Sequence, residues 1–362
     1  MRLQLTLGLV ALLGARSAHA EPAAPEAVAT LRIYADDDHV TVVSPSARVV
    51  ARVGARTQVT TELTADALSA ASVDVVTAAS PTAIVHEQRL DLGVTAVRER
   101  APGTTLGLGA RASHEFDYDA VRALASARTE VGQRSTTLEL RYQAGHDIAT
   151  ATRAPAFRRT RDSHQLMVLV GQLLGPRTVL DVIGEVALAR GYHASPYRRV
   201  ALEGGGGPLP RLVAERTPTG RTSAAFATRL RHALTRALFA SALYCVCVDD
   251  WAMASHTLTV ELVHQRGPRW RLGAFVRGYV QGAAAFYAAR YDEATGTPAR
   301  RTRDRTLGPM RSAYAAVTAD AALAPAWHLV LALGGLASWF PAFPAQAERR
   351  AVISTVSLSV AY

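Results

Sequence analysis

Acyl hydrolysis requires a nucleophile and a base, and the sequence places one such pair beside two adjacent carboxylates. Ser255 and His256 offer a nucleophile and a base, and the carboxylates of Asp249 and Asp250 precede them closely. The alternation over 254–266 is that of a strand, however, so Ser255 and His256 face opposite sides unless a bulge intervenes. The sequence contains no G-x-S-x-G, P-loop, CxxC or HExxH motif. We expect a protein that is not an enzyme and needs no cofactor, with a barrel hydrolase as the disfavoured alternative.

Two acidic runs offer oxygen ligands to a metal ion. Asp36, Asp37 and Asp38 end one expected strand, and Asp249 and Asp250 end another. Together they could hold Ca²⁺, although the spacing of an EF-hand is missing. The competing interpretation is a pair of solvated loop rims, and we favour it.

Both cysteines lie in one short segment, at Cys245 and Cys247. Residues two apart in a strand point the same way, with Cα atoms about 6.6 Å apart, so a disulfide between them would be strained. A redox or metal role is open, but no further Cys or His ligands cluster nearby. We favour two small residues on one strand face.

Two segments between expected strands carry candidate binding residues. In one, Tyr197 and Arg198 combine an aromatic ring with a guanidinium, which could hold an anionic or sugar ligand. We favour the alternative, in which Arg198 lies at the membrane rim with its charge in water. The other segment, 66–86, is small and polar and could form a constriction or plug in a lumen, an outer cap, or a short strand edge. Its candidate residues are Asp66, Ser72, Asp74 and Thr77.

The elements that must position these residues are strands, because a period of two recurs along the chain. Each such segment has one apolar face and one face rich in Arg, Glu, Asp and Gln, as in a barrel with a wet lumen. Many segments exceed ten residues, whereas a strand that crosses a membrane needs about 9–11. The residues expected on the lumen face include Arg141, Glu185, Arg271 and Arg277.

The strand count is about sixteen, with ends uncertain by about 2–4 residues. Short turns alternate with long loops, which is the arrangement of an outer-membrane barrel with short periplasmic turns and long outer loops. Trp327 and Trp339 share one face of a strand and would flank its apolar band as girdle residues. The predicted strands are 27–36, 39–53, 57–66, 87–99, 103–117, 119–131, 135–147, 163–174, 178–192, 221–232, 235–249, 254–266, 269–290, 310–322, 326–340 and 350–362.

The beginning of the chain indicates export. Arg2, an apolar run from Leu3 to Leu13 and the A-x-A site at Ala18–Ala20 form a secretory signal, too short to span a bilayer. We therefore divide the chain into a signal peptide, 1–20, and a barrel, 21–362. The net charge of +10 is carried by dispersed arginines, and the sequence has no lysine. This pattern argues against nucleic acid as a partner and suits a lumen or lipopolysaccharide phosphates.

Several stretches resemble an uncharacterised bacterial family, a domain of unknown function whose members look like outer-membrane β-barrels. The resemblance implies the fold and a place in the outer membrane of a Gram-negative bacterium, but no activity. The sequence departs from it at Ala78, where Gly is expected, and at its two cysteines. The resembling stretches are Tyr34–Val43, Asp66 with Ser69–Ser80, Gly191–Arg198, Asp249–Trp251 and Ser255–Thr257.

The last strand also resembles the signal by which barrel-assembly machinery captures its clients. Alternate apolar residues lead to a terminal aromatic, and an exposed edge strand of this kind can be bound by β-augmentation. The residues are Val356, Leu358, Val360 and Tyr362. The expected partners are therefore outer-membrane lipid, lipopolysaccharide and that machinery.

These observations predict an all-β protein, a transmembrane antiparallel β-barrel. Its expected function is a passive pore or a partly plugged barrel. A non-conducting structural or surface-binding protein is the alternative, with loops 193–221 and 292–309 as its working parts.

Overall fold

A computed structural model describes residues 25–70, 85–152, 154–204, 210–343 and 346–362. The predicted signal segment, 1–20, and most of the polar segment, 71–84, lie outside these residues. In the described part of the chain, no helix has the length and apolar character needed to cross a membrane.

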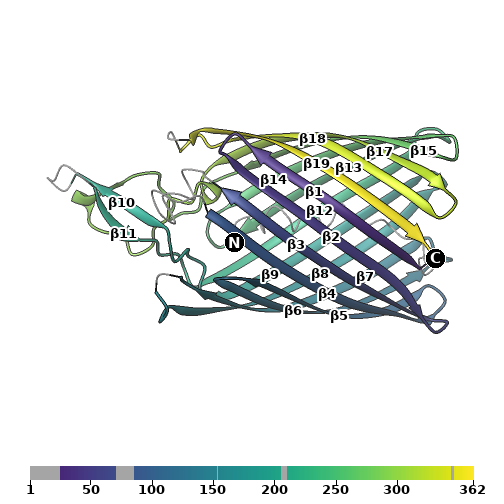
Figure 1. Cartoon of the computed structure of the whole chain (residues 1–362), viewed down its shortest axis with the longest axis horizontal. Helices are drawn as coiled ribbons and strands as arrows, with labels where there is room; N and C mark the ends of the chain where they lie inside the picture. Colours follow the sequence, from purple (N-terminus) through teal and green to yellow (C-terminus); the bar gives the residue numbers. More distant parts are fainter. Residues whose placement is uncertain (1–24, 71–84, 153, 205–209, 344–345) are drawn as a thin grey trace.

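Sixteen antiparallel strands close into a barrel, with β1 paired to both β2 and β19 (Figure 1). This confirms the predicted fold class, and every predicted strand has its counterpart. The strands are β1 (Glu26–Asp36), β2 (Val40–Val53), β3 (Thr57–Ala70), β4 (Val85–Ala101), β5 (Thr104–Glu115), β6 (Tyr118–Val131), β7 (Thr136–Thr150), β8 (Arg158–Gly175), β9 (Thr178–Gly191), β12 (Gly220–Ala233), β13 (Leu238–Asp249), β14 (Ala254–Arg266), β15 (Trp270–Gln281), β17 (Met310–Ala324), β18 (Trp327–Trp339) and β19 (Glu348–Ala361).

The two faces of the wall have the polarity expected of a membrane barrel. Large apolar side chains lie exposed on the outside, among them Leu108 at 70% and Val317 at 61%. Carboxylates such as Asp91 and Asp181 are only 3% exposed inside. Soluble proteins rarely leave so extensive an apolar surface uncovered, whereas a strand in hydrocarbon requires it.

The two rims differ in how they connect strands. At the short-turn rim, where the Tyr362 amide donates to the Pro25 carbonyl, tight turns join neighbouring strands. Gly103 and Gly267 adopt positive φ there, a conformation that glycine accepts without strain. At the opposite, long-loop rim, the two longest connections are 192–219, of which 205–209 lie outside the described residues, and 282–309.

Three predicted boundaries were wrong. The strand predicted over 269–290 ends at Gln281, the residue opposite which β17 begins. The loop predicted over 147–162 is shorter, since β7 continues to Thr150 and β8 starts at Arg158. The loop predicted from 66 begins later, since β3 extends to Ala70.

Candidate functional site

The two longest connections form a lobe over the long-loop rim. We call the described residues of 192–219 and 282–309 the cap. The cap contains a small sheet in which β10 (Arg199–Glu203) pairs with both β11 (Arg211–Ala214) and β16 (Tyr291–Asp292). It also contains the short 3-10 helices η1 (Glu293–Thr295) and η2 (Arg305–Leu307). In Figure 1, β10 and β11 stand beyond the end of the barrel, so this sheet is separate from the wall.

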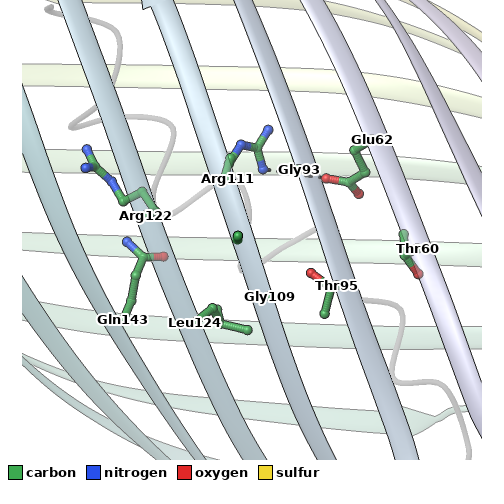
Figure 2. A pocket seen from close by; sticks show the side chains of 10 residues that line it. Thr60, Glu62, Gly93, Thr95, Gly109, Arg111, Arg122, Leu124 and Gln143 are labelled. Atoms are coloured by element: carbon green, nitrogen blue, oxygen red, sulfur yellow. Dashed lines mark ion pairs between the residues drawn. The ribbon is translucent and has the colours of Figure 1, made fainter.

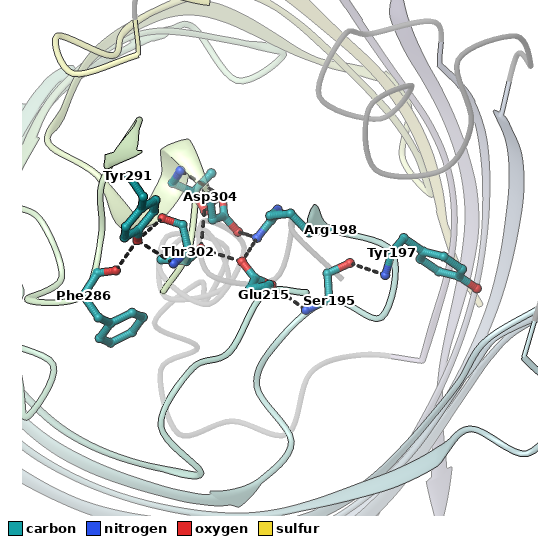
Figure 3. Close-up of polar contacts among 9 residues, drawn as sticks. Ser195, Tyr197, Arg198, Glu215, Phe286, Tyr291, Thr302 and Asp304 are labelled. Atoms are coloured by element: carbon teal, nitrogen blue, oxygen red, sulfur yellow. Dashed lines mark hydrogen bonds and ion pairs between the residues drawn. The ribbon is translucent and has the colours of Figure 1, made fainter. Parts of the chain in front are cut away.

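A buried arginine joins the two halves of the cap. Arg198 Nη1 donates to Glu215 Oε1 at 2.7 Å and to Asp304 Oδ2 at 2.6 Å. Thr302, which is fully buried, donates its hydroxyl to the same Glu215 oxygen at 2.5 Å. Ser195 donates its amide to the second Glu215 oxygen at 2.6 Å. Figure 3 shows this cluster within the outline of the strand ring.

The charges of this cluster depend on one another. Burial opposes the charge of Arg198, but Asp304 and Glu215 outweigh it, so the pKa of the guanidinium lies above its usual value. Two carboxylates face one guanidinium in a region closed to solvent. Arg198 therefore supplies the positive charge that both buried carboxylates face.

Arg305 ties the cap to two connections at the rim. Its Nη2 donates to Asp38 Oδ2, in the β1–β2 turn, at 2.7 Å. Its Nη1 donates to Gln346 Oε1, between β18 and β19, at 2.8 Å. The guanidinium also lies 4.6 Å from the centre of the buried Phe340 ring. This side of the cap is held by both charge and packing.

Tyr197 ties the cap to the opposite part of the wall. Its hydroxyl donates to Asp117 Oδ2, in the β5–β6 turn, at 2.6 Å. The same hydroxyl accepts from the Thr152 amide, between β7 and β8, at 3.1 Å. Burial is the main cause of a raised pKa for Tyr197, and its bond to Asp117 adds to it.

Trp251 forms a third anchor, at the β13–β14 turn. Its carbonyl accepts from the Ala285 amide at 2.9 Å, and its ring meets the edge of Phe286 at 5.0 Å between centroids. Arg221 lies over the indole at 4.6 Å. The cap is thus fastened to connections on several sides of the mouth.

His193 lies in the segment by which the cap leaves β9. Its Nδ1 donates to the Gly191 carbonyl at 3.0 Å, and its ring contacts Trp251 edge-on at 5.5 Å. Its Nε2 is buried and has no partner among the described residues. Burial lowers the pKa of His193, Arg161 and Arg221 lower it further, and only the Gly191 bond and Asp250 oppose them.

The acidic runs that were weighed as metal ligands make hydrogen bonds within and beside their turns. Asp36 Oδ1 accepts from the Val40 amide at 2.9 Å, and Asp37 Oδ1 accepts from the Arg350 amide at 2.8 Å. Asp249 binds Arg221 and the amides that follow in its turn, while the Asp250 amide donates to the Thr222 carbonyl. Among the described residues, no three His, Cys, Asp or Glu side chains gather as metal ligands.

The predicted lumen residues lie on strands of the wall but are not brought together. Arg141 is paired with Glu139, and Arg271 lies 3.6 Å from Asp320. Asp66 lies 4.0 Å from Arg89. Glu185 is opposite Met167 and Ala225, and Arg277 is opposite Thr259 and Tyr314. Ser72, Asp74 and Thr77 lie outside the described residues.

Ser255 and His256 face opposite sides of β14, as the alternation predicts. His256 is on the outer face, where its Nδ1 is 2.7 Å from the Tyr244 hydroxyl. Ser255 is opposite Cys247 on the inner face. Cys245 and Cys247 are both free thiols. The geometry therefore offers no nucleophile with an adjacent base at this position.

The outer face carries the predicted girdle and the end of the last strand. Trp327 and Trp339 are 43% and 38% exposed at the two ends of β18. Val356 and Leu358 are exposed on β19, and Tyr362, which directly follows the strand, is also exposed. The Tyr362 hydroxyl donates to the Val50 carbonyl at 3.1 Å. Val360 shares their alternation and is half-buried. An assembly signal at these residues stays a prediction.

Sequence reasoning singled out Arg198 and Tyr197 but missed their partners. Glu215, Thr302 and Asp304 lie far from Arg198 in the chain and have no periodic or motif context. The one available signal was the density of charged residues over 300–305.

Comparison with known proteins gives a family and a fold. A family model described as "Protein of unknown function (DUF3570)" matches residues 141–333. This range includes the resembling stretches around Tyr197 and Asp249, but not those before residue 141. No curated protein matches the sequence.

Two solved structures are similar in fold. A bacterial polysaccharide outer membrane secretin is 8% identical with a TM-score of 0.56, over 94% of this chain and 99% of the other. CdiB from Acinetobacter baumannii is 7% identical with a TM-score of 0.54, over 93% of this chain and 60% of the other. At such low identity these structures support the barrel fold alone.

Proposed function

The chain belongs to the DUF3570 family of proteins of unknown function, and we propose that it is an outer-membrane pore whose outer mouth is partly closed by the cap. The observation that carries this proposal is the set of cap anchors around the rim: Arg305 to Asp38 and Gln346, Tyr197 to Asp117, and Ala285 to Trp251. A lobe fastened on several sides of a mouth obstructs that mouth.

The proposal includes the location and partners expected from the sequence. The exposed apolar outer face and the tryptophans at both ends of β18 support insertion in a bilayer. Export through a cleaved signal, capture by assembly machinery, and contact with outer-membrane lipid and lipopolysaccharide remain parts of the same proposal.

Ion selectivity should be weak. Arg141, Arg271 and Arg277 were expected to favour anions in an open lumen. Arg141 and Arg271 are each close to a carboxylate, which cancels most of their field. Of these three arginines, we therefore expect Arg277 to give the pore a modest preference for anions.

Single-channel recording in planar bilayers tests the pore. The ends of both cap connections are adjacent, since the Gly191 amide donates to the Thr219 carbonyl and Gln281 is opposite Met310. Short Gly-Ser linkers can therefore replace 193–218 and 283–308 without stretching the wall. We expect small unitary currents from the intact protein and currents several times larger from the trimmed protein.

Two outcomes contradict the proposal. Equal currents from the intact and trimmed proteins would mean that the cap does not obstruct the mouth. If neither protein conducts, the pore is excluded, and the alternative of a non-conducting surface-binding protein takes its place. The projecting β10–β11 hairpin, with Leu212 63% exposed, is the feature that favours this alternative.

A further inference from the structure

The inner wall contains a recess that neither the cap nor the pore proposal uses. It has a volume of about 150 Å³ and is lined by residues of β3 to β7 (Figure 2). A water molecule takes about 30 Å³ of liquid, so the recess has room for a solute the size of a six-membered ring.

Two glycines make the recess. Gly93 on β4 is opposite Arg111, and Gly109 on β5 is opposite Thr95. A Cβ at Gly109 would come within 2.7 Å of Thr95 Oγ1 and 3.1 Å of the Val94 carbonyl, so no larger residue fits there without a shift. The residues around these two glycines have larger side chains. The recess therefore exists because the sequence has glycine at these two positions.

The charged residues of the recess are already neutralised. Arg111 Nε donates to Asp91 Oδ1 at 2.5 Å, and its Nη1 lies 3.5 Å from Glu62 Oε2. Arg122 Nη1 donates to Asp147 Oδ1 at 2.6 Å. An anion that entered would have to compete with these carboxylates, which disfavours an anion site.

The neutral residues of the recess retain hydrogen-bonding capacity. Thr60, Thr95, Gly109, Leu124 and Gln143 form one row of direct neighbours across five strands. Within the described part of the chain, the hydroxyls of Thr60 and Thr95 and the amide of Gln143 have no side-chain hydrogen bond. Leu124 supplies an apolar surface between them.

From this arrangement we propose that the recess binds a small, neutral, hydroxyl-rich ring, such as a cyclic polyol or a single sugar unit. Hydroxyl and amide groups exchange hydrogen bonds with such a ring, while Leu124 packs against its C–H face. The proposal does not depend on the barrel being conductive.

Saturation-transfer NMR on the full chain in detergent micelles tests this site, with inositol as the neutral probe and gluconate as the anionic probe. We expect inositol to bind the native protein and gluconate to bind more weakly. Gly93→Leu fills the recess from a position where an added Cβ meets nothing closer than 3.7 Å, and it should weaken inositol binding by at least about tenfold.

Two further variants keep the test independent of folding defects. Thr95→Val combined with Gln143→Leu preserves volume but removes hydrogen bonds, and it should also weaken binding. Thr318→Leu, on β17 seven strands round the wall from β5, adds bulk elsewhere in the lumen and should leave binding unchanged. The proposal is overturned by absence of inositol binding to the native protein, by equal binding to Gly93→Leu, or by a preference for gluconate.

Discussion

At the scale of single residues, the cap depends on charges that are buried together. Arg198 is 8% exposed and Glu215 is 7% exposed, so neither can exchange its partner for water. Removing one member of such a cluster leaves an uncompensated buried charge, which is far more costly than the loss of a surface ion pair. Arg198 should therefore govern the stability of the whole lobe.

Arg198→Met should destabilise the cap by about 3–5 kcal/mol, because Glu215 and Asp304 would both lose the buried guanidinium that donates to them. Hydrogen exchange measured on peptides from 199–204 and 211–219 should become much faster, while exchange in the barrel strands stays slow. Arg290→Met is the matched control, because Arg290 is 73% exposed in its side chain and lies 3.8 Å from Glu203. Slow exchange in Arg198→Met would show that other contacts hold the cap.

His193 should make the cap sensitive to pH. Its pKa is lowered by burial, so the folded cap binds a proton less readily than the loosened cap does. The stabilisation is complete above about pH 6.5, the ordinary pKa of histidine, and is lost as the pH falls toward the lower folded value. Hydrogen exchange in 192–203, corrected for its intrinsic rate, should accelerate between about pH 7 and pH 5.

His193→Leu should abolish this acceleration. His114→Ala should not, because His114 is exposed on the outer wall, 2.6 Å from Asp119, and makes no contact with the cap. A pH response that persists in His193→Leu would assign the effect to another group.

At the scale of elements, each strand separates an apolar outer face from a polar inner one. β3 offers a direct test with adjacent residues, because Leu63 is 44% exposed on the outside and Thr64 faces inward opposite Asp91. Leu63→Arg should lower the free energy of unfolding by about 2–4 kcal/mol near the bilayer midplane. Thr64→Arg should cost much less, since its new guanidinium enters a wet, charged lumen. Urea titration in lipid vesicles measures both, and equal losses would contradict the assignment of faces.

The strands of the wall could be predicted well from the sequence. Each of them has one face toward hydrocarbon and one toward the lumen, so apolar and polar residues alternate in every strand. The end of β15 was predicted poorly, because Ala283, Ala284 and Ala285 continue an apolar pattern without belonging to the wall. The small sheet of β10, β11 and β16 was not predicted, since its strands are short and β16 pairs with β10 across about ninety residues of chain. The partners of Arg198 were missed for the same reason: tertiary contacts alone bring them together.

At the scale of the molecule, the long-loop rim carries the cap, whereas tight turns connect the strands at the short-turn rim. The lumen between them is lined by ion pairs rather than by charges of one sign. A polar recess on the wall and an anchored cap at the mouth are separate features, at different heights of the barrel. Their functions can therefore be tested independently.

The closing seam of the wall has a consequence for how this chain tolerates change. β1 pairs with β19 along its whole length, and the Thr30 and Ser357 hydroxyls meet at 2.8 Å across 327 residues of sequence. Loss of either strand would leave two unsatisfied backbone edges, so the product would be an open, curled sheet prone to aggregation rather than a narrower ring. Natural variation in length should thus be confined to the connections, and strands should be gained or lost only as whole hairpins.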